Sequence, residues 1–313
     1  MYDSIKKLTF VIPCYRSQNT IEIVVDEVTD CVGKLGFSDY EIVLVNDCSP
    51  DNVWSVIKMI SKKNPRVKGI SFAKNFGQHA ALLAGYALAT GDVIVSLDDD
   101  GQVPVDELNL LLDKLCEGFD VVYAYYEEIQ RGLIRRFGTF MALRMGEIML
   151  GIPKGIKGSS FFVARKYIVD EMIRYTHPYP YLAGLVFRTT KNVACVMTHH
   201  RARLEGSSGY SFRGLLSLWI NGFTAFSVKP LEIGTYCGVV AAAMGFIFAV
   251  VTIVRKILNP AMVAGWASVI SVLLVIGGII LIMLGLIGEY VGRIYICIND
   301  APQYVIKEEI GGI

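Results

Sequence analysis

The chain has 313 residues, a net charge of +1, an apolar fraction of 53% and a mean hydropathy of +0.46. The balanced charge and the absence of a long basic run argue against a nucleic-acid-binding protein. The seven cysteines are scattered and form no CxxC pair, which argues against a disulfide framework and against a zinc site. The high apolar fraction comes from the C-terminal third, because residues 1–210 carry charges throughout.

The first part of the chain alternates short apolar runs with amphipathic segments. We predict strands at residues 8–13, 41–45, 67–72, 92–97 and 120–124, and helices at residues 20–35, 53–61, 78–88 and 105–117. Such alternation with short connections is typical of a doubly wound parallel sheet with right-handed crossovers. Ligands of these sheets bind at the carboxyl ends of the strands. Tyr15, Asp47, Asn75 and residues 98–102 all follow predicted strands, so we expect one pocket to collect them.

Two further segments have an amphipathic composition. Residues 131–150 predict a basic helix rich in apolar residues, which is either solvated or lies at the membrane surface. Residues 212–231 contain Trp219, Phe223 and Phe226 just before the next apolar stretch. Aromatic residues at such positions are typical of the membrane interface, so this segment is a second interfacial candidate.

Two stretches without any charged residue follow, Gly234–Val254 and Ala267–Gly288. Each is about as long as a helix that crosses a bilayer, which needs roughly 20 residues. The alternative, a pair of buried core helices, is disfavoured by the length of the uninterrupted runs. Residues 255–266 join the two spans, so we predict a membrane hairpin that returns the tail to the side of the first domain.

The domain organisation follows from these segments. We predict a catalytic domain at residues 1–210, a juxtamembrane segment at 211–231, a transmembrane hairpin at 232–292 and a tail at 293–313. The first apolar run is too short for a signal peptide, so we expect the large domain not to be exported. The second span carries a face of small residues, Gly277, Gly278, Gly285, Gly288 and Gly292. Such a face suits self-association, or packing against the first span.

The strongest local signal is the segment Asp98-Asp99-Asp100-Gly101-Gln102 at the end of an apolar strand. If the chain stays extended, Asp98, Asp100 and Gln102 point to one side. Two carboxylates and an amide oxygen suit Mg²⁺ or Mn²⁺, and such an ion assists the departure of a diphosphate. The alternative is an acidic turn that caps the following helix, with Asp106 and Glu107 in its first turn.

Four segments carry a resemblance: VIPCYR (residues 11–16), VNDCSPD (45–51), KNFGQHAALLAGYALATGDVIVSLDDDGQVP (74–104) and RLEGSSGY (203–210). Together they resemble the family 2 glycosyltransferases, and within them the polyprenyl-phosphate glycosyltransferases of the dolichol-phosphate mannose synthase, GtrB and ArnC type. The resemblance covers nearly all of residues 8–230, and the terminal hairpin resembles the GtrB and ArnC subgroup. It implies an α/β catalytic domain of the GT-A type, with a mostly parallel sheet, followed by a two-helix transmembrane hairpin.

The resemblance also implies how the nucleotide donor is held. Pro13 and Tyr15 match residues that pack around the base, and Val45 and Asp47 match the pair that meets the base and ribose. Ser17 stands where many relatives have a glutamate that contacts the nucleotide.

The acidic segment matches the part of the family that holds nucleotide and metal. Asp98, Asp99 and Asp100 match that segment, and Gln102 matches a further metal ligand. Asp99 occupies a position that is often alanine in relatives. The resemblance therefore implies that Asp99 contributes only backbone contacts, and that its side chain could as well face solvent.

The late motif Arg203, Gly206 and Ser208 matches residues that close over the diphosphate, which makes Asp100 and Arg203 the implied catalytic residues. Gly209 replaces a lysine of some relatives, and Arg201 is the nearest spare cation.

The acceptor side of the site is implied in the same way. Arg135 and Thr139 match residues that contact a lipid phosphate. Residues 156–158 lack the aspartate that relatives often carry. A phosphate monoester is already anionic at neutral pH, so the transfer needs no general base.

The implied function is the inverting transfer of a sugar from a nucleotide sugar, with UDP as the implied nucleotide, to undecaprenyl or another polyprenyl phosphate for cell-envelope glycan modification. We expect the protein in the inner (plasma) membrane, with the catalytic domain in the cytoplasm where nucleotide sugars are made. We also expect a homo-oligomer, for which a tetramer is one option. Two alternatives stay open, a polysaccharide-extending family 2 synthase and a non-catalytic membrane scaffold.

Overall fold

The computed structural model describes residues 2, 5–126, 144, 146–147, 151–199, 201, 229–258, 265–299 and 301–312. The chain divides into two compact units. Residues Met1–Gly222 and Ala301–Ile313 belong to the first unit, and residues Phe223–Asp300 belong to the second. The predicted interfacial segment at 212–231 lies outside the described residues except for its last three positions, and the helix at 131–150 falls almost entirely outside them.

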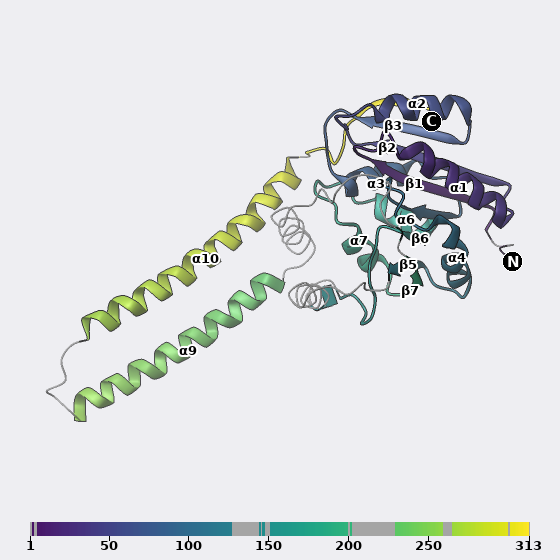
Figure 1. The fold of residues 1–313 in the computed structure, drawn as a ribbon. Helices are drawn as coiled ribbons and strands as arrows, with labels where there is room; N and C mark the ends of the chain where they lie inside the picture. The colour runs from purple at the N-terminus through teal and green to yellow at the C-terminus, as the bar shows by residue number, and fades with distance from the viewer. Residues whose placement is uncertain are drawn as a thin grey trace. The chain divides into compact units, whose positions relative to one another are not determined.

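The first unit is built on an eight-stranded, mostly parallel sheet with the strand order β7-β5-β6-β4-β1-β2-β3-β8 (Figure 1). Its strands are β1 (Lys7–Cys14), β2 (Asp39–Asn46), β3 (Val67–Phe72), β4 (Val93–Ser96), β5 (Val121–Tyr126), β6 (Phe162–Arg165), β7 (Val193–Thr198) and β8 (Ile306–Ile310). Strands β1 to β4 run parallel, whereas β6 is antiparallel to β4 and β5, and β8 is antiparallel to β3. The prediction of a mostly parallel α/β sheet is confirmed.

Helices of this unit connect the strands. They are α1 (Ile21–Leu35), α2 (Val53–Lys63), α3 (Gln78–Ala87), α4 (Leu108–Cys116), α6 (Lys166–Ile173) and α7 (Leu182–Thr189), with a 3-10 turn η1 (Val105–Glu107) before α4. α1 places apolar residues at helical spacing on its buried face and ends at Gly36, whose φ of +78° suits only glycine without strain. The predicted helix at 105–117 is therefore a 3-10 turn that continues as α4.

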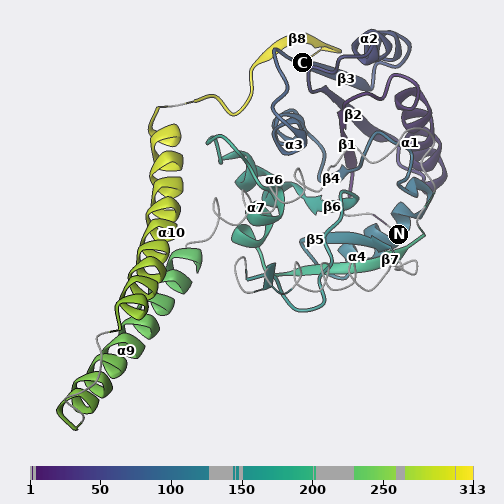
Figure 2. The same cartoon turned by 60° about the vertical axis from the view of Figure 1, so that its left-hand side comes forward.

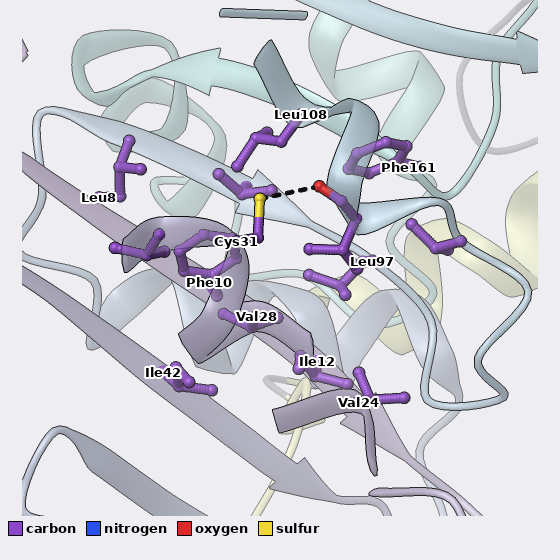
Figure 3. Close-up of a cluster of buried hydrophobic side chains, with 14 of the residues drawn as sticks. Leu8, Phe10, Ile12, Val24, Val28, Cys31, Ile42, Leu97, Leu108 and Phe161 are labelled. Carbon is purple, nitrogen blue, oxygen red and sulfur yellow. Dashed lines mark hydrogen bonds between the residues drawn. The ribbon is translucent and has the colours of Figure 1, made fainter. Parts of the chain in front are cut away.

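Strand β1 explains why the sheet has helices on both faces. All of its residues from Leu8 to Cys14 are buried. Leu8, Phe10 and Ile12 belong to the core cluster with Val24 and Val28 of α1 (Figure 3). The side chain of Val11 points the other way, where a Cβ added to Gly85 of α3 would lie 2.3 Å from Val11 Cγ1. A central parallel strand that is covered on both faces reads as a continuous apolar run rather than an alternating one.

The last strand, β8, forms the edge of the sheet beside β3, although the two strands are far apart in the sequence. The register of β8 pairs Ile310 with Gly69 and Glu308 with Ser71. Glu308 accepts hydrogen bonds at Oε2 from Trp54 Nε1, at 3.0 Å, and from Lys58 Nζ, at 2.5 Å. The predicted tail at 293–313 is thus divided, because its first residues extend the preceding helix and residues 301–312 join the first unit.

The second unit consists of α9 (Lys229–Leu258) and α10 (Trp266–Ile298). Both are long and apolar enough to cross a membrane, with candidate spans at Gly234–Arg255 and Val275–Ile298. The first span agrees with the predicted 234–254. The second candidate span, Val275–Ile298, begins and ends further along the chain than the predicted 267–288, and both ranges lie within α10.

Candidate active site

Three parallel strands end side by side and deliver the predicted residues to one edge of the sheet. β1 pairs with β2 on one side and with β4 on the other, and all three point the same way. The residues after β1 are Tyr15 to Ser17, Asp47 follows β2, and residues 98–102 follow β4. These segments therefore meet at the carboxyl edge of the sheet, and the single pocket expected to collect them stays a prediction.

Asp47 holds the loop that precedes α3. Its Oδ1 accepts from the Phe76 amide at 2.7 Å and its Oδ2 from the Gly77 amide at 2.8 Å, while Asn75 Nδ2 donates to the Asp47 carbonyl at 3.1 Å. Burial raises the pKa of the Asp47 carboxyl, which is 3% exposed, and the two backbone donors oppose that rise. Asp47 was predicted to meet the nucleotide. The structure adds a second role, because its carboxylate fixes residues 75–77.

Asp98 lies between two side chains that the sequence did not single out. Gln78 Nε2, at the start of α3, donates to Asp98 Oδ1 at 2.7 Å, and Ser160 Oγ, just before β6, donates to Oδ2. These two donors orient the carboxylate. Gln78 was visible in the sequence only as the residue after a glycine turn, and Ser160 carried no local signal.

Asp99 turns its side chain inward rather than toward solvent. Its Oδ2 accepts from the Tyr15 amide at 2.8 Å, and its carbonyl accepts from Thr20 Oγ1 at 2.6 Å. Burial raises the pKa of the Asp99 carboxyl to about 6, although the Ser17 hydroxyl and the Tyr15 amide favour the ionised form. Ser17 itself is 4% exposed, and its Oγ makes no hydrogen bond of standard geometry to the described residues. Asp99 therefore ties the loop after β1 to the acidic segment.

Asp100 and Gln102 lie on a turn and not on an extended chain. Asp100 Oδ1 accepts from the Gln102 amide at 3.0 Å, and Gly101 between them has a φ of +71°. The assumption of an extended chain, which placed Asp98, Asp100 and Gln102 on one side, is therefore wrong. The Gln102 side chain instead donates through Nε2 to the Arg201 carbonyl at 3.4 Å.

Negative charge still gathers at this edge. The pKa of the Tyr126 phenol is raised to about 12, first by burial and then by the charges of Asp98, Asp100 and Glu107. Both carboxylates thus act on the same phenol. Among the described residues no three His, Cys, Asp or Glu side chains are grouped as a ready metal site. The carboxylates of Asp98 and Asp100 and the amide oxygen of Gln102 are nevertheless hard oxygen donors, the chemical type that suits Mg²⁺ or Mn²⁺.

Two predicted donor-site residues are buried in the sheet. Pro13 and Val45 are both buried and face each other in the register of β1 and β2. The Val45 side chain is directed toward α3, where a Cβ added to Gly85 would lie 3.2 Å from Val45 Cγ2. By contrast, Tyr15 is 44% exposed, and the Arg16 guanidinium lies 5.5 Å from its ring centroid. Of these residues, Tyr15 offers a ring to a ligand.

Arg201 is not a spare cation. Its Nη1 lies 3.0 Å from Glu27 Oε2, and its Nη2 pairs with Asp106. Both partners come from the helical layer that includes α1 and η1. The interpretation of Arg201 as the nearest spare cation is therefore wrong. Arg203, Gly206 and Ser208 of the late motif, and Arg135 and Thr139 of the acceptor side, lie outside the described residues.

His79 is buried near the start of α3. Burial lowers the pKa of its imidazole to about 4, and its Nδ1 accepts from the Leu182 amide at 3.5 Å. Its ring meets Tyr181 edge-on, with the centroids 5.6 Å apart. The imidazole thus connects the start of α3 with the start of α7.

Comparison with protein families identifies both units. The model of "Glycosyl transferase family 2" matches residues 9–172, and the model of "GtrB C-terminal hairpin" matches residues 229–294. The chain is also 31% identical over 305 residues to "Uncharacterized glycosyltransferase YkcC" of Bacillus subtilis (strain 168), which covers 97% of this chain and 94% of that protein.

Solved structures share the fold of the first unit. Glucosyl-3-phosphoglycerate synthase from Mycobacterium tuberculosis, in complex with Mn²⁺, UDP-glucose and phosphoglyceric acid, gives a TM-score of 0.53 at 18% identity and covers 71% of this chain and 78% of that one. The complex of the same protein with UDP gives a TM-score of 0.52 at 18% identity, covering 71% and 79%. At this identity the likeness shows a GT-A-like fold and no more.

Proposed function

The chain belongs to glycosyl transferase family 2, and from this premise we propose that it transfers a sugar from a nucleotide sugar to a polyprenyl phosphate with inversion. The observation that carries the proposal is the joining of a family 2 domain to a GtrB C-terminal hairpin in one chain. Two apolar helices beside a transferase domain suit an acceptor that is itself held in a bilayer. Undecaprenyl phosphate is the acceptor proposed.

The nucleotide sugar binds at the carboxyl edge of β1, β2 and β4 in this proposal. Tyr15 offers an exposed ring to the base, next to the strand ends that carry the paired residues Pro13 and Val45. Asp98 and Asp100 supply negative charge near the position of the diphosphate. UDP is the proposed nucleotide because the fold neighbour holds UDP-glucose with Mn²⁺.

A divalent cation is the proposed cofactor. Asp98, Asp100 and Gln102 would hold Mg²⁺ or Mn²⁺ through carboxylate and amide oxygens. When bound, such an ion neutralises charge on the departing diphosphate. Gln78 and Ser160 orient the Asp98 carboxylate for this contact through their hydrogen bonds.

The proposed reaction balances without a protein base. An oxygen of the lipid phosphate forms a bond to the anomeric carbon of the sugar, and the bond from that carbon to the nucleoside diphosphate breaks with its electron pair. Attack opposite the leaving group inverts the anomeric configuration. Near neutral pH the phosphate monoester is already anionic. Residues 156–158 therefore need no carboxylate for this reaction. Within this stretch, Lys157 has its Nζ 5.3 Å from the Tyr125 ring centroid.

Residues outside the described ranges complete the proposal, by family pattern alone. Arg203 and Ser208 would contact the donor diphosphate, with Arg203 as a catalytic residue beside Asp100. Arg135 and Thr139 would contact the lipid phosphate. Arginine suits these positions because its planar fork binds phosphate in a bidentate way.

The membrane arrangement proposed has the catalytic unit in the cytoplasm of a cell whose plasma membrane holds the hairpin. Residues 301–312 return to the sheet of the first unit as β8, so both ends of the hairpin connect to the same unit. This connection is expected when the chain crosses the membrane an even number of times. A homo-oligomer is proposed because Cβ atoms added at Gly277, Gly285 or Gly292 would meet no described atom within 4 Å.

A lipid-labelling assay tests the proposal. Membranes that contain the full chain and undecaprenyl phosphate are incubated with a panel of radiolabelled nucleotide sugars and Mn²⁺, and the lipid fraction is analysed by mass spectrometry. We expect label in a polyprenyl-phosphate sugar. The Asp100→Ala variant should lose about 100-fold to 1000-fold of the transfer rate, as when one group that stabilises developing charge is removed.

The matched control is Asp170→Ala, which removes a half-exposed carboxylate from α6 that pairs with Lys166. It should leave transfer unchanged. Undiminished transfer by Asp100→Ala would contradict the metal assignment. A polymeric product would support a polysaccharide-extending synthase instead, and no product from the whole panel would support a non-catalytic scaffold.

A further inference from the structure

The segment that follows α10 lies outside both family matches and contacts two loops that adjoin the candidate active site. The matches end at residues 172 and 294, whereas the segment comprises residues 301–312. Its strand β8 runs beside β3 (Figure 2). The residues just before β8, Gln303 to Val305, are not part of the strand and contact two loops of the first unit.

Aromatic side chains connect this segment to the loop at residues 73–77. The Tyr304 ring stacks on the Phe72 ring, with centroids 5.4 Å apart and an interplanar angle of 9°. Phe72, which is 1% exposed, meets the Phe76 ring edge-on at 5.7 Å. The Phe76 amide is one of the two that donate to the Asp47 carboxylate. A continuous set of contacts thus leads from Tyr304 to Asp47.

The same loop is held through its backbone. The Ala73 amide donates to the Val305 carbonyl at 2.9 Å, next to the irregular pairing of β3 and β8 between Ser71 and Phe72. On the other side of the loop, Asp47 accepts from the Phe76 and Gly77 amides. The loop is therefore fixed between the C-terminal segment and the end of β2.

Gln303 contacts the second loop, between α6 and α7. Its Nε2 donates to the Tyr175 carbonyl at 2.9 Å and to the His177 carbonyl at 3.0 Å. Further along this loop, the Tyr181 ring packs against His79. His79 follows Gln78, whose side chain donates to Asp98. Both loops that the segment contacts therefore adjoin residues that orient Asp47 and Asp98.

We propose that residues 303–305 are a positioning element of the donor site, with Tyr304 as the positioning residue for the loop at 73–77 and Gln303 for the loop at 175–181. This inference rests on the proposed function for the identity of the ligand. It assigns to the chain beyond the hairpin a part in donor binding. Beyond covering the edge of β3 with β8, the C-terminal segment contacts the residues around Asp47 through residues 303–305.

Hydrogen exchange of the full-length protein in detergent tests the positioning role without any ligand. An aromatic pair contributes enough free energy that its loss should speed exchange of the Phe76 and Gly77 amides by about twofold to tenfold. We expect this in Tyr304→Ala and also in Tyr304→Leu, which keeps apolar bulk but not a planar ring. Tyr304→Phe keeps the ring and should exchange like the unaltered protein.

The control within β8 is Glu308→Gln. It removes the ion pair with Lys58 and leaves an amide oxygen that can still accept from Trp54, away from the loop at 73–77. Exchange at Phe76 and Gly77 should stay unchanged in this variant. Gln303→Ala should speed exchange at residues 175–182 and leave β1 unchanged.

Donor binding supplies the second readout. With UDP and MnCl₂ as the probe, calorimetry should show weaker binding to Tyr304→Ala by about threefold to tenfold, with Tyr304→Phe close to the unaltered protein. In transfer assays the KM for the nucleotide sugar should rise while kcat is kept, because Tyr304 touches no reacting atom.

Unchanged exchange at Phe76 and Gly77 in both Tyr304→Ala and Tyr304→Leu would overturn the inference. Faster exchange spread equally over β1 and α1 would overturn it too, because it would indicate general destabilisation. Faster exchange confined to Phe76 and Gly77, in a protein that binds no nucleotide and transfers no sugar, would support the positioning role of Tyr304 and overturn the proposed function. The two failures are therefore distinguishable.

Discussion

Strand β1 and helix α10 are both apolar, yet their side chains have opposite environments. From Leu8 to Cys14 every residue of β1 is buried between helices on the two faces of the sheet. In α10, Leu281 and Ile282 are 70% and 72% exposed within their unit. Apolar surface is stable only when it is removed from water, so the hairpin needs lipid or another chain to cover it. The hydrophobicity of a segment thus predicts that the segment is shielded from water, but not whether its own unit, lipid or another chain shields it.

The two regions also satisfy their backbone groups differently. In the hairpin each helix bonds its own amides and carbonyls, as a membrane span requires. In the catalytic unit the strands need neighbours, and the loops at their carboxyl ends need side chains such as Asp47 and Asp99. Polar chemistry therefore concentrates in the unit whose backbone depends on distant partners.

The largest expected difference between the regions comes from truncating one apolar side chain in each. Ile12→Ala, in the fully buried β1, should lower the free energy of unfolding by about 2–5 kcal/mol. Leu281→Ala, in the exposed face of α10, should cost about 1 kcal/mol or less. Urea unfolding of the full-length protein in detergent measures both. An equal loss would mean that Leu281 is buried against a second copy of the chain.

The next-largest difference between the catalytic unit and the hairpin should appear in their stability at acidic pH. Burial opposes ionisation of Glu41, but donors from Thr9, Thr90 and Lys68 outweigh it and lower the pKa of the carboxyl to about 2. Because the pKa of Glu41 is lowered from 4.5, its carboxylate stabilises the folded protein above pH 4.5, and this stabilisation is lost as the pH falls toward 2. The loss should be on the order of 3 kcal/mol from this group.

Thermal unfolding as a function of pH measures the effect of Glu41. Glu41→Gln should be less stable at pH 7 and show a shallower decline between pH 4.5 and pH 2. The helical signal of the hairpin should persist in that range, because residues 234–254 contain no charged group. A slope unaltered by Glu41→Gln would show that other carboxylates dominate acid unfolding.

The smallest of these differences concerns two glycines. A Cβ at Gly85 would lie 2.3 Å from Val11 Cγ1, whereas a Cβ at Gly285 would meet no described atom within 4 Å. We expect Gly85→Ala to cost about 1–3 kcal/mol of unfolding free energy through overpacking. Gly285→Ala should have little effect, as measured by the same urea titration. A large cost at Gly285 instead would place another helix against that face.

Much of the catalytic sheet was predictable because its elements are locally encoded. The strands β1 to β5 and the helices between them agree with the predicted ranges to within two residues at each end. Continuous apolar runs of five or six residues mark buried strands, and apolar residues at helical spacing mark α1. In contrast, β6 has four residues and inserts antiparallel between β4 and β5, and no local pattern predicts that insertion.

The candidate site was predictable as a set of segments and not as a set of contacts. The acidic segment after β4 is evident in the sequence, because carboxylates directly after a buried strand are unusual. Its partners are not, since Gln78, Ser160 and Tyr15 come from other loops. Arg201 looked available in the sequence and is paired with Glu27 in the structure. Ser17, where the family pattern has glutamate, lies beside the Asp99 carboxylate.

The sequence by itself determined the local features: alternation of strands and helices, two apolar spans, and acidic residues at a strand end. These follow from periodicity and composition within windows of a few to about twenty residues. Only the tertiary structure decided that Asp99 faces inward, that Asp47 holds the loop at 73–77, and that residues 301–312 complete the sheet. Each of these joins residues far apart along the chain, and hydrogen bonds and ring contacts between them exist only once the sheet has formed.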